Sequence, residues 1–247
     1  MGRSRIHIDV QSMAVADAIA ALEKKTRVRT RPASEPEVAV AAKPARKGVV
    51  GRSDKPDGGA GEIRIIGGQW RRTRLPVAKR PGLRPTPDRV RETLFNWLGQ
   101  DLTGWRCMDA FAGTGALGLE AASRGAKDVW MIEQDGALVA QLNTLKQRLA
   151  AQAVKVQRGD AVSALQQAAP DSLDLVLLDP PFEGDALFLP ALRAAQRAVT
   201  AEGWVYLEAP SEWDEAALAA LGLVRQRYLK AGAVHAHLLR KQPTEAA

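Results

Sequence analysis

Residues 105–133 read WRCMDAFAGTGALGLEAASRGAKDVWMIE and decide the fold. The first seven residues form an apolar run that predicts a buried strand. Gly113, Gly115 and Gly118 then make a GxGxxG turn into a helical segment, and Glu133 ends a second apolar run, 20 residues after Gly113. Strand, glycine-rich turn, helix and a strand ending in an acid are typical of a nucleotide-binding α/β unit.

The segments that follow keep alternating between strand and helix. Further strands are predicted at 154–160, 173–179, 203–209, 223–230 and 233–240, and helices at 136–151, 161–169, 186–199 and 212–221. Strands that are apolar throughout and alternate with helices are typical of a parallel sheet covered on both faces. The sequence therefore predicts a doubly wound, mostly parallel α/β fold.

Two basic elements precede this body. Residues 63–77, IRIIGGQWRRTRLPV, predict a β-hairpin that turns at Gly67-Gly68. Residues 86–99 predict a helix with Thr86 as N-cap, Pro87 in the first position and Gly99 as the stop. Its apolar stripe leaves Arg89 and Arg91 facing outward or toward a ligand.

Charge divides the 247-residue chain unequally. Residues 1–61 and 62–105 each carry a net charge of +5, whereas residues 106–247 carry −3, giving +7 in total. We expect a disordered basic extension over 1–61, because it is rich in Pro, Gly and charge and has no aromatic residue after position 30. Residues 62–247 are predicted to form one domain, with 62–105 as a hairpin and helix cover and 106–247 as the catalytic core. A basic front on such a body suggests a nucleic-acid partner.

Several classes of protein are disfavoured by composition. One cysteine and three histidines exclude an internal disulfide and make a zinc site improbable, so no metal is predicted. No apolar run reaches the length of a membrane span. We expect a cytoplasmic protein without membrane contact, and nothing in the sequence demands more than a monomer.

Asp109 bears on the identity of the nucleotide. The glycine turn alone permits NAD, FAD or S-adenosylmethionine (SAM), since each has ribose hydroxyls that an acid such as Glu133 can bind. Asp109 lies four residues before the first glycine, where its carboxylate would repel a pyrophosphate and attract the ammonium and sulfonium of SAM. The sequence therefore favours SAM. Asp160 either accepts from the adenine amine or caps the helix that follows it.

The motif Asp179-Pro180-Pro181-Phe182 follows a strand that is apolar almost throughout. Neither proline has an N–H, and an ionised Asp179 only accepts, so the loop offers acceptors and almost no donors. Such a wall suits an NH2 group, held by the Asp179 carboxylate and the Pro180 carbonyl, while Phe182 provides a face on which a base can stack. The motif predicts methylation of an exocyclic amine of a base, by direct displacement.

Taken together, these motifs resemble those of the RsmD-type 16S rRNA guanine-N2 methyltransferases. The resemblance covers about residues 62–240 and rests on IRIIGGQWR, GLRPTPDRVRETLFNWL, DAFAGTGALGLEA and DPPF. It implies a Rossmann-like class I SAM-dependent fold with a seven-stranded sheet, and a target in 16S rRNA or the small ribosomal subunit. It also implies roles for individual residues. The target guanine is held by Asp179, Pro180 and Phe182; SAM by Arg84, Thr86, Asp109, Gly113, Gly115, Glu133 and Asp160; and rRNA by Arg64, Trp70, Arg71, Arg72 and Arg74.

Other functions remain open from the residues alone. An adenine-N6 or other amino-methyltransferase on RNA or DNA would use the same loop. An NAD-dependent oxidoreductase would use the same GxGxxG turn, but Asp109 and the lack of a substrate domain disfavour it. A non-catalytic RNA-binding module is disfavoured by the intact loop at Asp179–Phe182.

Overall fold

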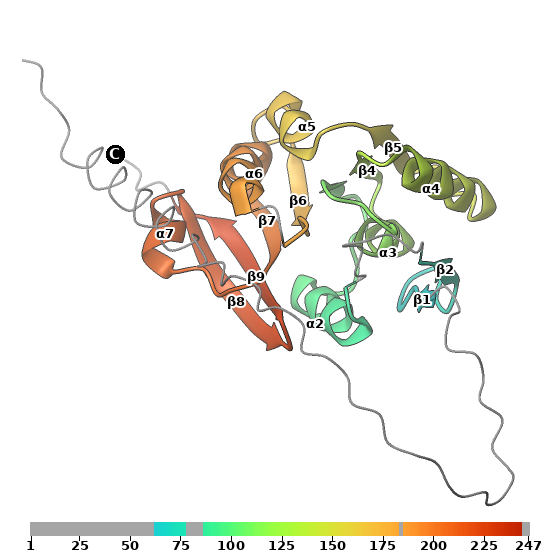
Figure 1. The fold of residues 1–247 in the computed structure, drawn as a ribbon, viewed down its shortest axis with the longest axis horizontal. Coiled ribbons are helices and arrows are strands. Elements are labelled where there is room, and N and C mark those ends of the chain that lie inside the picture. The colour runs from blue at the N-terminus through green and yellow to red at the C-terminus, as the bar shows by residue number, and fades with distance from the viewer. Residues whose placement is uncertain (1–61, 78–85, 183–184, 244–247) are drawn as a thin grey trace, which may run out of the picture.

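The computed structural model describes residues 62–77, 86–182 and 185–243 of the chain. The predicted disorder of residues 1–61 lies outside the described residues. Within them, the fold is built on a seven-stranded sheet beside a small two-stranded one (Figure 1).

The large sheet has the strand order β5-β4-β3-β6-β7-β9-β8. The pairs from β5 to β7 are parallel, and β9 runs antiparallel to both β7 and β8. This confirms the predicted mostly parallel, seven-stranded sheet. The strands are β3 (Arg106–Asp109), β4 (Asp128–Glu133), β5 (Val154–Arg158), β6 (Leu173–Leu178), β7 (Val199–Ala209), β8 (Leu223–Ala231) and β9 (Val234–Lys241).

Helices cover both faces of this sheet, as a doubly wound fold requires. They are α2 (Asp88–Leu98), α3 (Ala116–Ser123), α4 (Gly136–Arg148), α5 (Ala161–Gln167), α6 (Asp185–Ala198) and α7 (Glu215–Ala219). One core cluster joins α2, α3 and α4 to the face that carries Cys107 and Tyr206. A second joins α5, α6 and α7 to the face that carries Met108 and Val205, so successive strand residues serve opposite cores.

The strand order places one particular site. From β3 the chain builds outward through β4 and β5, then returns to place β6 on the other side of β3. Between β3 and β6 the order reverses, and in open α/β sheets ligands bind at such a switch point, at the carboxyl ends of the strands. Asp109 ends β3 and Asp179 directly follows β6, so the fold brings these two acids to the predicted place.

The basic hairpin exists, but its predicted turn is wrong. Strands β1 (Glu62–Arg64) and β2 (Arg74–Pro76) pair antiparallel, and residues 65–73 form a longer loop between them. Gly68 has φ +72°, and a Cβ there would lie 1.8 Å from the carbonyl oxygen of Ser123. The glycine is therefore required because the loop packs closely against the end of α3, rather than for a tight hairpin turn.

The helix after the hairpin begins differently from the prediction. Pro87, not Thr86, occupies the N-cap position, and no side chain caps the helix; the Thr86 hydroxyl instead donates to Oδ2 of Asp179 at 3.3 Å. The predicted stop is confirmed, since Gly99 has φ 94°. Arg89 is exposed as predicted, whereas the prediction for Arg91 is wrong, because its side chain is fully buried.

Candidate active site

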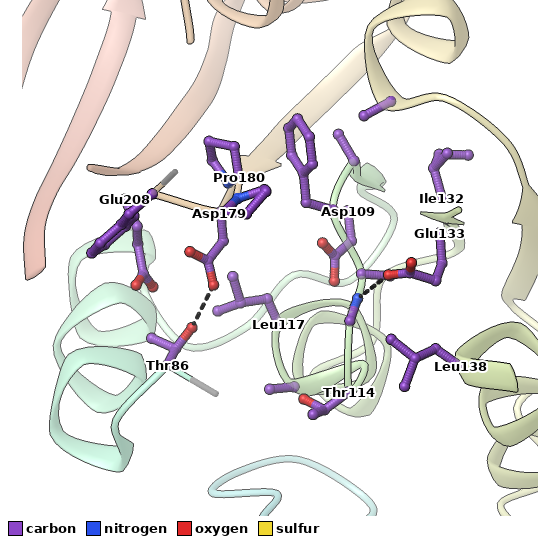
Figure 2. A pocket seen from close by; sticks show the side chains of 18 of the residues that line it. Thr86, Asp109, Thr114, Leu117, Ile132, Glu133, Leu138, Asp179, Pro180 and Glu208 are labelled. Carbon is purple, nitrogen blue, oxygen red and sulfur yellow. Dashed lines mark hydrogen bonds between the residues drawn. The ribbon is translucent and has the colours of Figure 1, made fainter. Parts of the chain in front are cut away.

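A cavity of about 880 Å³ opens at the carboxyl ends of the parallel strands. Its walls come from the β3–α3 turn, the end of β4, the loop after β6, the end of β7, the start of α2 and the β8–β9 turn. The volume lies within the range of ordinary small-molecule sites. Figure 2 shows that acidic side chains from several of these elements point into one space.

Asp109 lies at the base of this cavity and is only 1% exposed. Its Oδ2 accepts from the N–H of Gly118 at 2.8 Å, which ties the carboxylate to the beginning of α3. Its Oδ1 has no hydrogen-bond partner within the described part of the chain. Burial raises the pKa of Asp109 to about 7, while hydrogen bonds from the backbone act in the opposite direction. The free oxygen therefore offers an unsatisfied acceptor to a cationic ligand.

The glycine turn fixes the next wall. The N–H of Gly113 donates to Oε2 of Glu133 at 2.9 Å (Figure 2). The N–H of Asp135 donates to Oε1 of Glu133 at 2.8 Å. These bonds orient the Glu133 carboxylate at the end of β4, where its remaining lone pairs can accept from hydroxyls. Gly115 has φ 83° and lies outside the cavity lining; a Cβ there would lie 2.7 Å from Leu142. Glycine is therefore required at position 115 by the backbone conformation of the turn and by its close packing against Leu142.

Asp160 caps a helix. It is the N-cap of α5, accepting from the N–H of Ser163 at 2.8 Å, and its other oxygen accepts from Gln134 at 3.2 Å. Its neighbours Gly159 and Ala161 line the cavity, whereas Asp160 itself does not. The backbone on either side of Asp160 therefore meets the cavity, and the carboxylate holds it in place.

The predicted loop after β6 forms the opposite wall. Asp179, Pro180, Pro181 and Phe182 all line the cavity. Asp179 is partly accessible and Phe182 is half-buried. Burial, followed by the negative charges of Glu208 and Asp109, raises the pKa of Asp179 well above its ordinary value. The structure thus brings the base-holding residues and the SAM-holding Asp109 of the prediction into one cavity.

Sequence reasoning missed Glu208 and did not anticipate the contact that Thr86 makes. Glu208 lies near the end of β7, is 2% exposed and lines the same cavity; its Oε1 accepts from the hydroxyl of Tyr206 at 2.8 Å. An acid near the end of an apolar strand next to the switch point was the available signal. Thr86 lines the cavity and its hydroxyl donates to Asp179 (Figure 2), while its role in holding SAM stays a prediction. Arg84 lies outside the described residues.

The predicted RNA-binding arginines lie on the surface of the hairpin. Arg64, Arg71, Arg72 and Arg74 are exposed. Arg74 is paired with Glu62 at 3.1 Å. Trp70 is half-buried against the core, so only part of its ring is available to a base.

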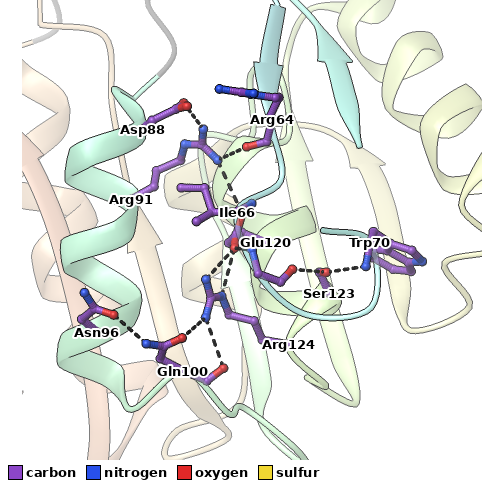
Figure 3. A network of polar contacts seen from close by, with 11 residues as sticks. Arg64, Ile66, Trp70, Asp88, Arg91, Asn96, Gln100, Glu120, Ser123 and Arg124 are labelled. Atoms are coloured by element: carbon purple, nitrogen blue, oxygen red, sulfur yellow. Dashed lines mark hydrogen bonds and ion pairs between the residues drawn. The ribbon is translucent and has the colours of Figure 1, made fainter. Parts of the chain in front are cut away.

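A buried ionic network anchors this hairpin to the site (Figure 3). Glu120 on α3 accepts from the N–H groups of Ile66 and Gly67, each at 2.7 Å, and from Arg124 at 2.8 Å. Arg91 lies 3.5 Å from Glu120 and donates to the carbonyl oxygens of Arg64 at 2.9 Å and Thr86 at 3.3 Å. The Arg91 guanidinium therefore connects the basic hairpin with the segment that contacts Asp179.

The carboxylates that line the cavity suit SAM. An ammonium and a sulfonium are cations, and the buried Oδ1 of Asp109 lacks a partner within the described residues. A second carboxylate, Glu133, stands at the end of the neighbouring strand, suited to ribose hydroxyls. A pyrophosphate would meet Asp109, Asp179 and Glu208 in the same space, which like charge disfavours. The site therefore matches a cationic nucleoside better than a dinucleotide.

Comparisons with known proteins agree with this geometry. The sequence profile of the family described as "conserved hypothetical protein 95" matches residues 63–240. The protein named "Ribosomal RNA small subunit methyltransferase D" is 52% identical in Escherichia coli K12 over 124 residues, 50% of this chain and 62% of that protein. Its Haemophilus influenzae counterpart is 46% identical over 125 residues, 49% of this chain and 65% of that protein. The chain thus aligns with less than two thirds of the length of these relatives.

Solved structures extend the similarity over the whole fold. The E. coli protein yhhF matches with a TM-score of 0.64 and 40% identity, over 74% of this chain and all of that one. HI0767 from H. influenzae matches with a TM-score of 0.61 and 31% identity, over the same shares. None of the helices in the described ranges is long and apolar enough to cross a membrane. With the profile matching most of its length, the chain belongs to the conserved hypothetical protein 95 family, and its resemblance to the RsmD-type proteins is confirmed.

Proposed function

We propose that this protein transfers a methyl group from SAM to the exocyclic N2 amine of a guanine in 16S rRNA. The observation that carries the proposal is the cavity at the β3–β6 switch point, which joins an unpartnered acid suited to SAM with the acceptor-only loop at Asp179–Phe182. The relatives named as small-subunit rRNA methyltransferases support rRNA as the substrate.

In this proposal Asp109 and Glu133 hold the cofactor. Asp109 Oδ1 binds its cationic end, and Glu133, oriented by the N–H groups of Gly113 and Asp135, accepts from the ribose. When bound, SAM supplies an electrophilic methyl group whose bond to sulfur breaks with both electrons going to the sulfur. The residues of the chain hold, orient and desolvate the partners of this reaction, which needs no covalent enzyme intermediate.

The target base is held from the other side. Asp179 accepts one amine hydrogen and the Pro180 carbonyl accepts the other, so the wall recognises an NH2 group and disfavours a carbonyl edge. Two acceptors aimed at those hydrogens draw the nitrogen away from planarity, which makes its lone pair available to the methyl group. Phe182, half-buried at the cavity rim, is placed to stack on the base, a contact worth about 1–3 kcal/mol.

The hairpin provides the surface for RNA. Exposed Arg71 and Arg72 can each neutralise a phosphate, and the network of Arg91 and Glu120 fixes the hairpin relative to the cavity. Phosphate contacts of this kind position a nucleic acid without reading its sequence. We infer that the substrate reaches the cavity across this face as part of the small subunit or its assembly intermediate.

The test is methyl transfer from radiolabelled SAM, offered in parallel to unmethylated 16S rRNA, to small subunits lacking the modification, and to duplex DNA. We expect label in the rRNA or the subunits and none in DNA. Label in DNA would reject the substrate, and no label in any polymer would reject the proposed function. Titration with SAM and NAD is the accompanying control: binding of NAD in preference to SAM would contradict the assignment of the cavity.

A further inference from the structure

Glu208 and Asp179 are neighbours because of strand register. Strands β6 and β7 are parallel, and Leu178 pairs with Leu207, so the next residue of each strand lies beside the other at the edge of the cavity. Both side chains line the cavity. Glu208 is 2% exposed, whereas Asp179 is partly accessible, so Asp179 is the carboxylate that a ligand meets first.

The charged and titratable groups around Glu208 come from four elements. Asp179 follows β6, Asp109 ends β3, Tyr206 lies on β7 itself and Arg91 lies on α2; the residue opposite on β9 is the uncharged Ala236. The Tyr206 hydroxyl donates to Glu208 at 2.8 Å. Arg91 and the tyrosine both favour the charged form of Glu208. These groups oppose the effect of burial, so that Glu208 carries its negative charge next to Asp179 above about pH 7.

The two carboxyl groups titrate as a pair. Burial raises the pKa of Glu208 to about 7. Burial also raises the pKa of Asp179, and the next largest cause is the charge of Glu208. The Thr86 hydroxyl, which donates to Asp179, opposes this rise. A carboxylate with a raised pKa holds a proton more tightly, so the neighbour makes Asp179 a stronger base than an isolated aspartate.

We propose that Glu208 is a positioning residue whose negative charge makes Asp179 the acceptor of the proton that leaves the base amine. The inference rests on the proposed function and adds the fate of that proton. In the reaction the amine nitrogen forms the new bond to the methyl carbon and becomes positively charged. One N–H bond then breaks, its electron pair remains on nitrogen, and the proton passes to the Asp179 carboxylate. The methylated amine is left neutral, and Asp179 is left as a neutral acid.

The test is the pH dependence of single-turnover methyl transfer to 16S rRNA or small subunits at saturating SAM, between about pH 5.5 and 9. The wild-type rate should rise with pH as Asp179 ionises and then level off. In Glu208→Gln the midpoint should move to lower pH by at least about one unit, because the like charge that opposes ionisation is gone. The plateau should also fall, since a less basic carboxylate accepts a proton less readily.

Control variants separate this role from a structural one. Gln retains an oxygen that can accept from Tyr206 and removes a buried acid whose pKa is raised to about 7, so Glu208→Gln should melt no lower than wild type. Glu202→Gln changes an exposed acid on the same strand, paired with Arg240 at 3.2 Å, and should leave the midpoint unmoved. In Asp179→Asn, the rate of methyl transfer should no longer rise with pH.

A second readout does not depend on activity. In protein carrying carbon-13 in its aspartate carboxyl groups, the resonance lost in Asp179→Asn identifies Asp179. Its titration midpoint should fall in Glu208→Gln. An unmoved midpoint, or a rise, would overturn the role of Glu208. If the wild type methylates no RNA, the proposed function fails and this inference with it; transfer with an unshifted pH profile overturns this inference alone.

Discussion

Replacing Asp109 with Asn should separate the binding of SAM from the stability of the fold. Asn retains a carbonyl oxygen that can accept from the N–H of Gly118, now at 2.8 Å from Oδ2. The position of the unpartnered Oδ1 is then taken by an NH2 group, which cannot accept from an ammonium. Asp109→Asn thus replaces a charged acceptor with a donor at nearly constant shape.

The loss of affinity can be sized from this contact. A hydrogen bond to a charged group contributes about 1.5–3 kcal/mol, which corresponds to about 10- to 100-fold in a dissociation constant. We therefore expect Asp109→Asn to weaken SAM binding by that factor in isothermal titration calorimetry. Because the pKa of Asp109 is raised to about 7, wild-type affinity should also increase as pH rises from 5.5 to 8, and the variant should lack this dependence.

The same substitution should stabilise the protein in the absence of SAM. The folded pKa of about 7 lies above the unfolded value of about 3.9, so the folded state binds more protons between these two values. Stability contributed by this group falls as pH rises from about 4 to about 7, by up to about 4 kcal/mol. Urea unfolding of the unliganded protein should show that the variant is more stable than wild type at pH 8. The difference in the free energy of unfolding between variant and wild type should be smaller at pH 5.

Two results would refute this reasoning. A dissociation constant for SAM within twofold of wild type would show that Asp109 does not contact the cofactor. A variant less stable than wild type at pH 8 would show that the buried carboxylate is not a cost to the fold. A weaker affinity together with a higher stability is the result that the structure predicts.

Three further predictions concern other parts of the molecule. Asp179→Ala should abolish methyl transfer while the dissociation constant for SAM, measured by calorimetry, changes little; loss of SAM binding with turnover intact would contradict its role. Glu120→Gln should lower the free energy of unfolding in urea by about 3–5 kcal/mol, because buried Arg124 loses its carboxylate partner and Arg91 keeps only Asp88, whereas exposed Glu202→Gln should cost under about 0.5 kcal/mol. Arg71→Ala and Arg72→Ala should each reduce the salt dependence of RNA binding by about one phosphate contact, and an unchanged slope would remove that residue from the interface.

The fold was predictable from the sequence because its signals are local. The apolar strand over 173–179, the glycine turn after Asp109 and the stop at Gly99 each depend on residues close together in the chain. Since parallel strands share one edge, the positions of Asp109 and Asp179 followed from the strand order.

The errors arose where a distant contact overrides a local preference. Thr-Pro-Asp is a typical helix start, but the Thr86 hydroxyl bonds instead to Asp179, 93 residues away. Arg91 was expected to face outward or toward a ligand, since a buried arginine is rare without partners. It pairs with Asp88 on its own helix, and its other acidic partner, Glu120, lies on another helix. Glu208 carried no motif at all, and only the register between β6 and β7 brings it beside Asp179.

The central claim is that this cavity methylates an exocyclic amine of guanine. The most direct measurement is the identity of the nucleoside that carries the methyl group, after small subunits lacking the modification react with this protein and deuterium-labelled SAM and are digested for mass spectrometry. We predict one labelled nucleoside, N2-methylguanosine, and its absence with Asp179→Ala. Label in N6-methyladenosine would contradict the proposed base, and label on a ribose or a ring carbon would contradict the chemistry assigned to the loop at Asp179–Phe182.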